Sequence, residues 1–140
     1  MDGRWNLAGR FEEVATARRG VRELLRAAGY DDETVHLGEL ATGELVANAM
    51  EHGDGADVQV VLRTAADTAM LTVTNEGPLF AAPVIDLRTH SFADRGRGLA
   101  MLSAFGCTLV VDGPLAERCA VTVTLPARAA GTQGSVASRA

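Results

Sequence analysis

The spacing of apolar residues predicts two helices in the first half of the chain. Apolar residues recur at steps of three and four from Glu12 to Ala28, and Gly29 follows as a stop signal. Asp31 and Asp32 are candidate N-caps for a second helix over roughly Glu33 to Glu51. That second helix is apolar on several sides, so we expect neighbouring elements to cover it.

Alternation of apolar and polar residues predicts strands in two hairpin-like pairs. The first pair is Asp57–Thr64 and Ala69–Asn75, joined by the short turn AADT, and a weaker pattern at Arg4–Ala8 indicates one earlier strand. The second pair is Cys107–Asp112 and Arg118–Leu125, with GPLAE between them. Pairs of this kind favour a largely antiparallel sheet.

The remaining segments complete the expected architecture. Residues 76–95 contain two prolines without a clean period, and we expect a long functional loop there, before a short helix over Gly98–Phe105. With helices on one face of the sheet, the fold class is a two-layer α/β sandwich. We expect a single domain over residues 1–126, followed by a disordered tail over residues 127–140.

The composition of the chain argues against several functions and kinds of site. The net charge of −5 argues against a general nucleic-acid binder, and the absence of lysine excludes a lysine nucleophile or a P-loop lysine. Cys107 and Cys119 have no partners at metal-ligand spacing, so a zinc site is not expected. No signal peptide and no long apolar run are visible, so we expect a cytoplasmic protein without a membrane span.

One polar row interrupts the second predicted helix. Glu44, Asn48 and His52 are four residues apart, so their Cβ atoms lie about 6 Å apart, on the side that also carries Leu37 and Leu45. A carboxylate and an amide oxygen so placed can hold a hydrated Mg²⁺, which takes few protein ligands and keeps several waters. From the residues alone, a buried polar network or an exposed helix edge explains the row equally well.

Two further stretches carry candidate chemistry. In RGRGLAML, residues 95–102, two glycines enter an apolar helix, where backbone N–H groups and the positive dipole end suit a phosphate. In LTVTNEGP, residues 71–78, Asn75 shares a strand face with Leu71 and Val73, so its amide should point inward and can read the edge of a base. The alternatives are an ordinary loop for the first stretch and turn chemistry for Asn75.

Together, in this order and spacing, the motifs resemble one family. A helix with E-x-x-x-N-A-x-x-H, a strand ending in N-x-G, a long loop and G-x-G-L are similar to the GHKL ATPases of gyrase and histidine kinase type, which implies their Bergerat fold. The short form, GELVANAMEHG with RGRGL, looks most like the bacterial anti-sigma factor serine kinases. The resemblance covers about residues 10–126.

The resemblance implies roles for the matching residues. Glu44 would be catalytic, because it matches the glutamate that polarises the attacking hydroxyl, and Asn48 would bind Mg²⁺. Arg18 and Arg22 would contact protein partners, namely a sigma factor and its antagonist, although a solvated face explains these charges as well. A homodimer is also implied. The residues that would bind ATP are Asn48, His52, Asn75, Gly77, Arg95, Gly96, Arg97, Gly98 and Leu99.

Three departures from the family pattern fall on the adenine side. Asn75 stands where the family usually has aspartate, and Leu79 replaces a second glycine. Near the start of the last strand, Cys119 and Ala120 stand where a G-T pair is usual. The implied function is therefore an ATP·Mg²⁺-dependent kinase that phosphorylates a serine of an anti-anti-sigma protein and sequesters a sigma factor. The alternative is a partner-sequestering module of the same fold with weak or no nucleotide turnover.

Overall fold

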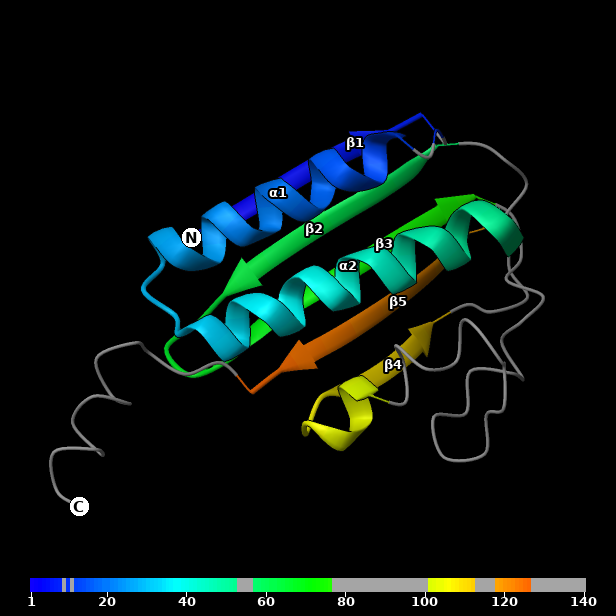
Figure 1. Cartoon of the computed structure of the whole chain (residues 1–140). Coiled ribbons are helices and arrows are strands. Elements are labelled where there is room, and N and C mark those ends of the chain that lie inside the picture. The colour runs from blue at the N-terminus through cyan, green and yellow to red at the C-terminus, as the bar shows by residue number, and fades with distance from the viewer. Residues whose placement is uncertain (9, 11, 53–56, 77–100, 113–117, 127–140) are drawn as a thin grey trace, which may run out of the picture.

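The structure is a computed structural model that describes residues 1–8, 10, 12–52, 57–76, 101–112 and 118–126. Its helices are α1 (Glu12–Ala27) and α2 (Asp32–His52). Its strands are β1 (Asp2–Leu7), β2 (Val58–Thr64), β3 (Ala69–Glu76), β4 (Thr108–Asp112) and β5 (Arg118–Leu125). Both helices lie on one face of a five-stranded sheet (Figure 1), which confirms the predicted two-layer α/β sandwich.

The sheet is antiparallel throughout its described strands, in the order β1-β2-β3-β5-β4. Both predicted hairpin-like pairs are confirmed, and the weak first strand exists with an earlier start at Asp2. The pattern did not predict that β5, rather than β4, lies beside the central strand β3. The reason is burial, since Val121, Val123 and Leu125 of β5 are at most 6% exposed, whereas Val110 of β4 is 62% exposed.

Local hydrogen bonds begin each helix where the sequence indicates. The Asp31 carboxylate accepts a hydrogen bond from the Thr34 backbone N–H at 2.9 Å, which confirms Asp31 as the N-cap of α2. At α1, Glu13 accepts hydrogen bonds from the backbone N–H groups of Ala8 and Arg10. The stop after α1 is also confirmed, because Gly29 has a φ of 89°, in the left-handed region that favours glycine.

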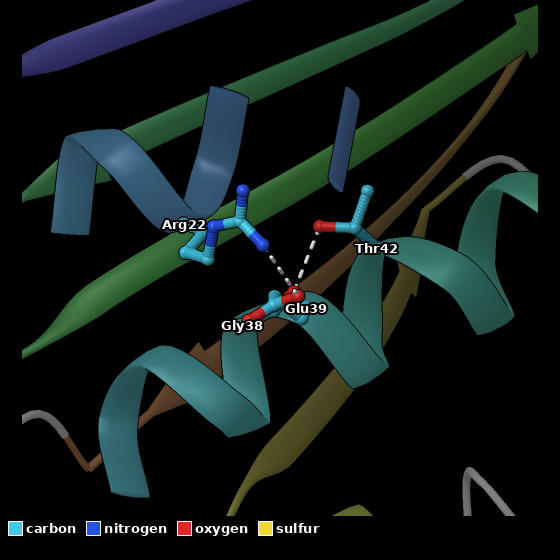
Figure 2. Close-up of polar contacts among 4 residues, drawn as sticks. All are labelled: Arg22, Gly38, Glu39 and Thr42. Carbon is cyan, nitrogen blue, oxygen red and sulfur yellow. Dashed lines mark hydrogen bonds and ion pairs between the residues drawn. The ribbon is translucent and has the colours of Figure 1, made fainter. Parts of the chain in front are cut away.

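The two helices pack closely through a glycine of α2. A Cβ atom at Gly38 would lie 2.5 Å from Leu25 Cδ1 and 3.2 Å from Val21 Cγ1, both fully buried side chains of α1. The backbone carbonyl of Gly38 also accepts a hydrogen bond from the buried Thr42 hydroxyl at 2.8 Å (Figure 2). Gly38 therefore sets the distance between the helices, and so positions α2 over the sheet.

A second glycine positions β1 against α1, and this contact can be tested with Trp5, the single tryptophan of the chain. A Cβ atom at Gly20 would lie 2.5 Å from Trp5 Cε2, so Gly20→Ala forces the half-buried indole to move. The overlap costs about 1–3 kcal/mol and better helix propensity returns about 1 kcal/mol, so we expect a net loss of about 1 kcal/mol.

The measurement is tryptophan fluorescence during urea unfolding. We expect Gly20→Ala to shift the native emission maximum to longer wavelength, whereas Arg19→Ala, at an exposed position on the same helix, leaves it unchanged. An unchanged emission maximum and midpoint in Gly20→Ala would show that Trp5 does not pack on this glycine.

Candidate ATP-binding site

The C-terminal ends of α2 and β3 lie at the same end of the sandwich (Figure 1). α2 packs against the sheet and makes more contacts with β3 than with any other strand. Its last three turns carry Glu44 and Asn48, while β3 ends near Asn75. The fold therefore brings together two of the three stretches in which the sequence predicted chemistry.

The polar row on α2 borders the buried side of the helix and does not lie within it. Leu37, Ala41 and Leu45 are at most 4% exposed, whereas Glu44 and Asn48 are half-buried. The expectation that the polar side chains share the buried line of Leu37, Ala41 and Leu45 is therefore wrong, because Glu44 and Asn48 lie beside that line on the helix surface. Because of this offset, both side chains can reach a ligand held beside the core.

Asn75 lies deep in the sheet. Its side chain is 3% exposed and shares the inner face of β3 with the buried Leu71 and Val73, which confirms the predicted inward orientation. In the strand register it stands between Val58 of β2 and Cys119 of β5. The residue that departs from the family pattern on β5 is therefore the direct neighbour of the one that departs on β3.

Other predicted site residues are placed only in part. His52 is the last residue of α2, at the same end as Asn75. The remaining predicted residues lie outside the described part of the chain, so their roles stay predictions: Gly77, Leu79, Arg95, Gly96, Arg97, Gly98 and Leu99. The helix predicted over Gly98–Phe105 is confirmed where it is described, at residues 101–104.

The predicted partner residues Arg18 and Arg22 lie on α1 and both reach α2. Arg22 Nη1 is 3.9 Å from Glu39 Oε2 (Figure 2), and Arg18 Cδ would be 3.7 Å from a Cβ atom at Gly43. The Arg22 side chain is 37% exposed, so the ion pair adds at most about 1 kcal/mol to stability. The ion pair with Glu39 could not be predicted from the sequence, because a contact between two helices leaves no periodic pattern in the sequence of either helix.

Comparison with known proteins identifies the architecture. Residues 7–122 match the family model described as a histidine kinase-like ATPase domain. The chain belongs to the histidine kinase-like ATPase family. Family membership implies ATP binding, typically with Mg²⁺.

Solved structures agree with this ATPase fold. The histidine kinase AdeS of Acinetobacter baumannii is 15% identical with a TM-score of 0.55, covering 89% of this chain and 67% of its own. A mycobacterial sensor histidine kinase, MprB, is 20% identical with a TM-score of 0.50, covering 92% of this chain and 99% of its own. No curated protein sequence matches significantly. Within the described residues, no helix of this ATPase domain is long and apolar enough to cross a membrane.

The described residues of the ATPase domain fit a nucleotide with Mg²⁺. Asn48 offers an amide oxygen and Glu44 a carboxylate, which are the hard oxygen groups that Mg²⁺ and its bound waters favour. Asn75 presents an amide inside the sheet. Buried polar side chains in proteins are nearly always hydrogen-bonded. An amide oxygen can accept a hydrogen bond from the exocyclic amino group of a base.

Cys107 is a core residue of the domain, and its chemistry can be tested directly. Burial raises the pKa of its thiol from 9.0 to about 11, so the unreactive thiol form predominates at neutral pH. In a Cys119→Ser background, we expect a disulfide reagent at pH 8 to modify native Cys107 only as fast as the protein unfolds. Rapid modification of the folded protein would contradict this burial.

The same pKa shift has a defined effect on stability. Because the folded-state pKa exceeds the unfolded one, the unfolded chain loses its proton first as the pH rises. The contribution of Cys107 to stability is complete below about pH 9 and declines as the pH rises toward 11. Cys107→Ala should remove this part of the alkaline destabilisation.

Proposed function

We propose that this ATPase domain is an anti-sigma-factor-type regulator. It would bind ATP and Mg²⁺, phosphorylate a serine of an anti-anti-sigma protein in the cytoplasm, and sequester a sigma factor without contacting nucleic acid itself. The observation that carries the proposal is that the half of α2 with Glu44 and Asn48 and the end of β3 with the buried Asn75 lie toward the same end of the sandwich. The GELVANAMEHG and RGRGL stretches support this kinase type.

The chemistry follows from the positions of the side chains. Asn48 would hold Mg²⁺, which supplies charge neutralisation for the phosphate oxygens. Glu44, one helical turn earlier, would accept the proton of the serine hydroxyl and direct its oxygen toward the terminal phosphate. Both groups come from one rigid helix, so the main contribution of the protein is positioning. Arg18 and Arg22, which lie on α1 and reach α2, would belong to the partner surface.

The second candidate function is a binding module of the same fold without useful turnover. It is favoured by the neutral Asn75 and its neighbour Cys119, because a neutral acceptor forms a weaker hydrogen bond to adenine than a carboxylate does. Such a protein would still sequester a partner, with nucleotide optional.

The test is transfer of labelled phosphate from ATP to an anti-anti-sigma protein in the presence of Mg²⁺. The kinase proposal predicts a stable phosphoserine on the substrate protein and no transfer when Mg²⁺ is chelated. Partner binding without transfer would favour the second candidate. Transfer that continues in Asn48→Ala would contradict the site assigned on α2.

Asn75→Asp is expected to bind ATP more tightly than the wild type. A hydrogen bond that involves a charged group is worth about 1 kcal/mol more than a neutral one, which corresponds to about fivefold in affinity. The free variant should also unfold at lower urea concentration, because the position is only 3% exposed and a carboxylate there must be desolvated. Calorimetric titration with ATP measures the first effect.

The matched control is Thr74→Ala, one residue earlier on β3 with its side chain on the opposite face of the sheet. We expect its ATP affinity to equal that of the wild type. A tenfold loss of affinity in Asn75→Asp would place the adenine elsewhere.

A further inference from the structure

Asn75 is the one buried polar side chain that the structure describes at the shared end of α2 and β3 (Figure 1). The other buried polar side chains of the described residues are Asp31, Thr34 and Thr42. Asp31 and Thr34 meet in the N-cap at the start of α2, and the Thr42 hydroxyl donates to the Gly38 carbonyl within that helix. Among the described residues, hydrogen bonding inside this end of the sheet therefore depends on Asn75.

Two valines adjoin Asn75 on the inner face of the sheet. Val73 precedes it by two residues on β3, and Val58 stands opposite it on β2. Both valines are 1% exposed, and a valine side chain has no hydrogen-bond donor or acceptor. Neither valine can distinguish a donor on a ligand from an acceptor, so among these three residues only the Asn75 amide can do so.

The amide of Asn75 both donates and accepts hydrogen bonds, unlike a carboxylate. It offers two N–H groups on Nδ2 and two lone pairs on Oδ1, whereas an ionised aspartate offers lone pairs only. A half-turn about the Cβ–Cγ bond exchanges donor and acceptor with almost no change in shape. Asn75 also interacts within the domain, and its several hydrogen-bonding sites allow it to keep such a contact while it binds a base.

Purine bases differ at the edge that such an amide would bind. Adenine has a 6-amino donor beside the N1 acceptor, whereas hypoxanthine and guanine have a 6-oxo acceptor beside an N1–H donor. An amide matches the adenine edge when Oδ1 faces the amino group, and it matches the 6-oxo edge when Nδ2 faces the carbonyl oxygen. A carboxylate matches only the adenine edge in this position, because it has no hydrogen to donate to a 6-oxo oxygen.

We propose that the base site of this domain accepts 6-oxo purines as well as adenine, and that Asn75 is the residue responsible. This selectivity rests on the proposed function in one respect, namely that Asn75 faces the base of the bound nucleotide. The ligand class is then the purine nucleoside triphosphates and not ATP alone. The triphosphate and its Mg²⁺ are common to the whole class, so Glu44 and Asn48 would serve each nucleotide equally.

The test is calorimetric titration of the full chain with ATP and with inosine triphosphate, each in the presence of Mg²⁺. Inosine triphosphate is the probe because it differs from ATP only at the 6-position and at N1. We expect the wild type to bind the two nucleotides with affinities within about fivefold of each other. Asn75→Asp should instead favour ATP by about twentyfold or more, because its carboxylate strengthens one contact and removes the other. Thr74→Ala, on the opposite face of the sheet, is the matched control and should keep the wild-type ratio.

The wild-type ratio needs no variant, so the test does not depend on how well Asn75→Asp folds. In Asn75→Ser, whose neutral hydroxyl also donates and accepts, both affinities should fall while their ratio stays near that of the wild type. A wild type that binds ATP but prefers it to inosine triphosphate by more than about tenfold would overturn the broad selectivity and leave the proposed function standing. The same ratio in the wild type and in Asn75→Asp would assign the base edge to another residue. A wild type that binds neither nucleotide would contradict the proposed function itself.

Discussion

Glu44→Gln is expected to reduce phosphoryl transfer to the antagonist serine by about a hundredfold or more, while ATP affinity stays within about threefold. Glutamine keeps the size of the side chain and one acceptor oxygen but cannot accept the hydroxyl proton. The half-buried position of Glu44 on α2 leaves it able to reach a substrate beside the core. The measurement is the initial rate of labelled phosphate transfer at saturating ATP and Mg²⁺.

The matched control is Glu39→Gln, on the same helix. Glu39 Oε2 lies 3.9 Å from Arg22 Nη1 of α1, so the variant loses only a weak ion pair. We expect its transfer rate to remain within about twofold of the wild type. If Glu44→Gln transfers phosphate as fast as Glu39→Gln does, Glu44 is not the catalytic base.

Gly38→Ala is expected to lower the free energy of unfolding by about 2 kcal/mol, although alanine favours helices more than glycine does. The new methyl group would lie 2.5 Å from Leu25 Cδ1, and that leucine is fully buried between α1 and the sheet. Either the helices separate or the leucine leaves its rotamer. Urea unfolding followed by circular dichroism measures the change.

Gly43→Ala, five residues further along α2, is the matched control. Its methyl group would have only ordinary contact with Arg18 Cδ at 3.7 Å, so the helix propensity gain of about 1 kcal/mol should appear as added stability. Opposite signs for the two glycines would confirm that α1 and α2 touch at Gly38. Equal stabilisation by both substitutions would contradict the observed packing.

Much of the fold could be predicted from local patterns. The start of α2 at Asp31, the end of α1 at Gly29 and the inner faces of β2 and β3 each depend on neighbouring residues in the chain. Strand order could not be predicted in this way, because the placement of β5 beside β3 depends on which strand has its apolar face fully buried in the folded domain. The contact between Gly38 and Leu25 likewise joins residues from two helices and leaves no periodic trace.

The candidate site was predictable to a similar extent. The spacing of four residues predicted that Glu44 and Asn48 lie on one side of a helix. The alternation of apolar and polar residues along β3 predicted that the Asn75 side chain points inward. Spacing could not show that the polar row borders the core, since burial depends on where the sheet meets the helix. Nor could it show that Cys119 stands directly across from Asn75, which follows from the register of β3 with β5.

The central claim is that the shared end of α2 and β3 binds ATP with Mg²⁺. Calorimetric titration of the wild type and of Asn48→Ala, each with and without Mg²⁺, tests it most directly. We expect one ATP bound per chain, with an affinity that falls when Mg²⁺ is removed. We expect an equal fall in Asn48→Ala, where Mg²⁺ no longer has any effect. Absence of ATP binding by the folded wild type, or a Mg²⁺ dependence that Asn48→Ala retains in full, would contradict it.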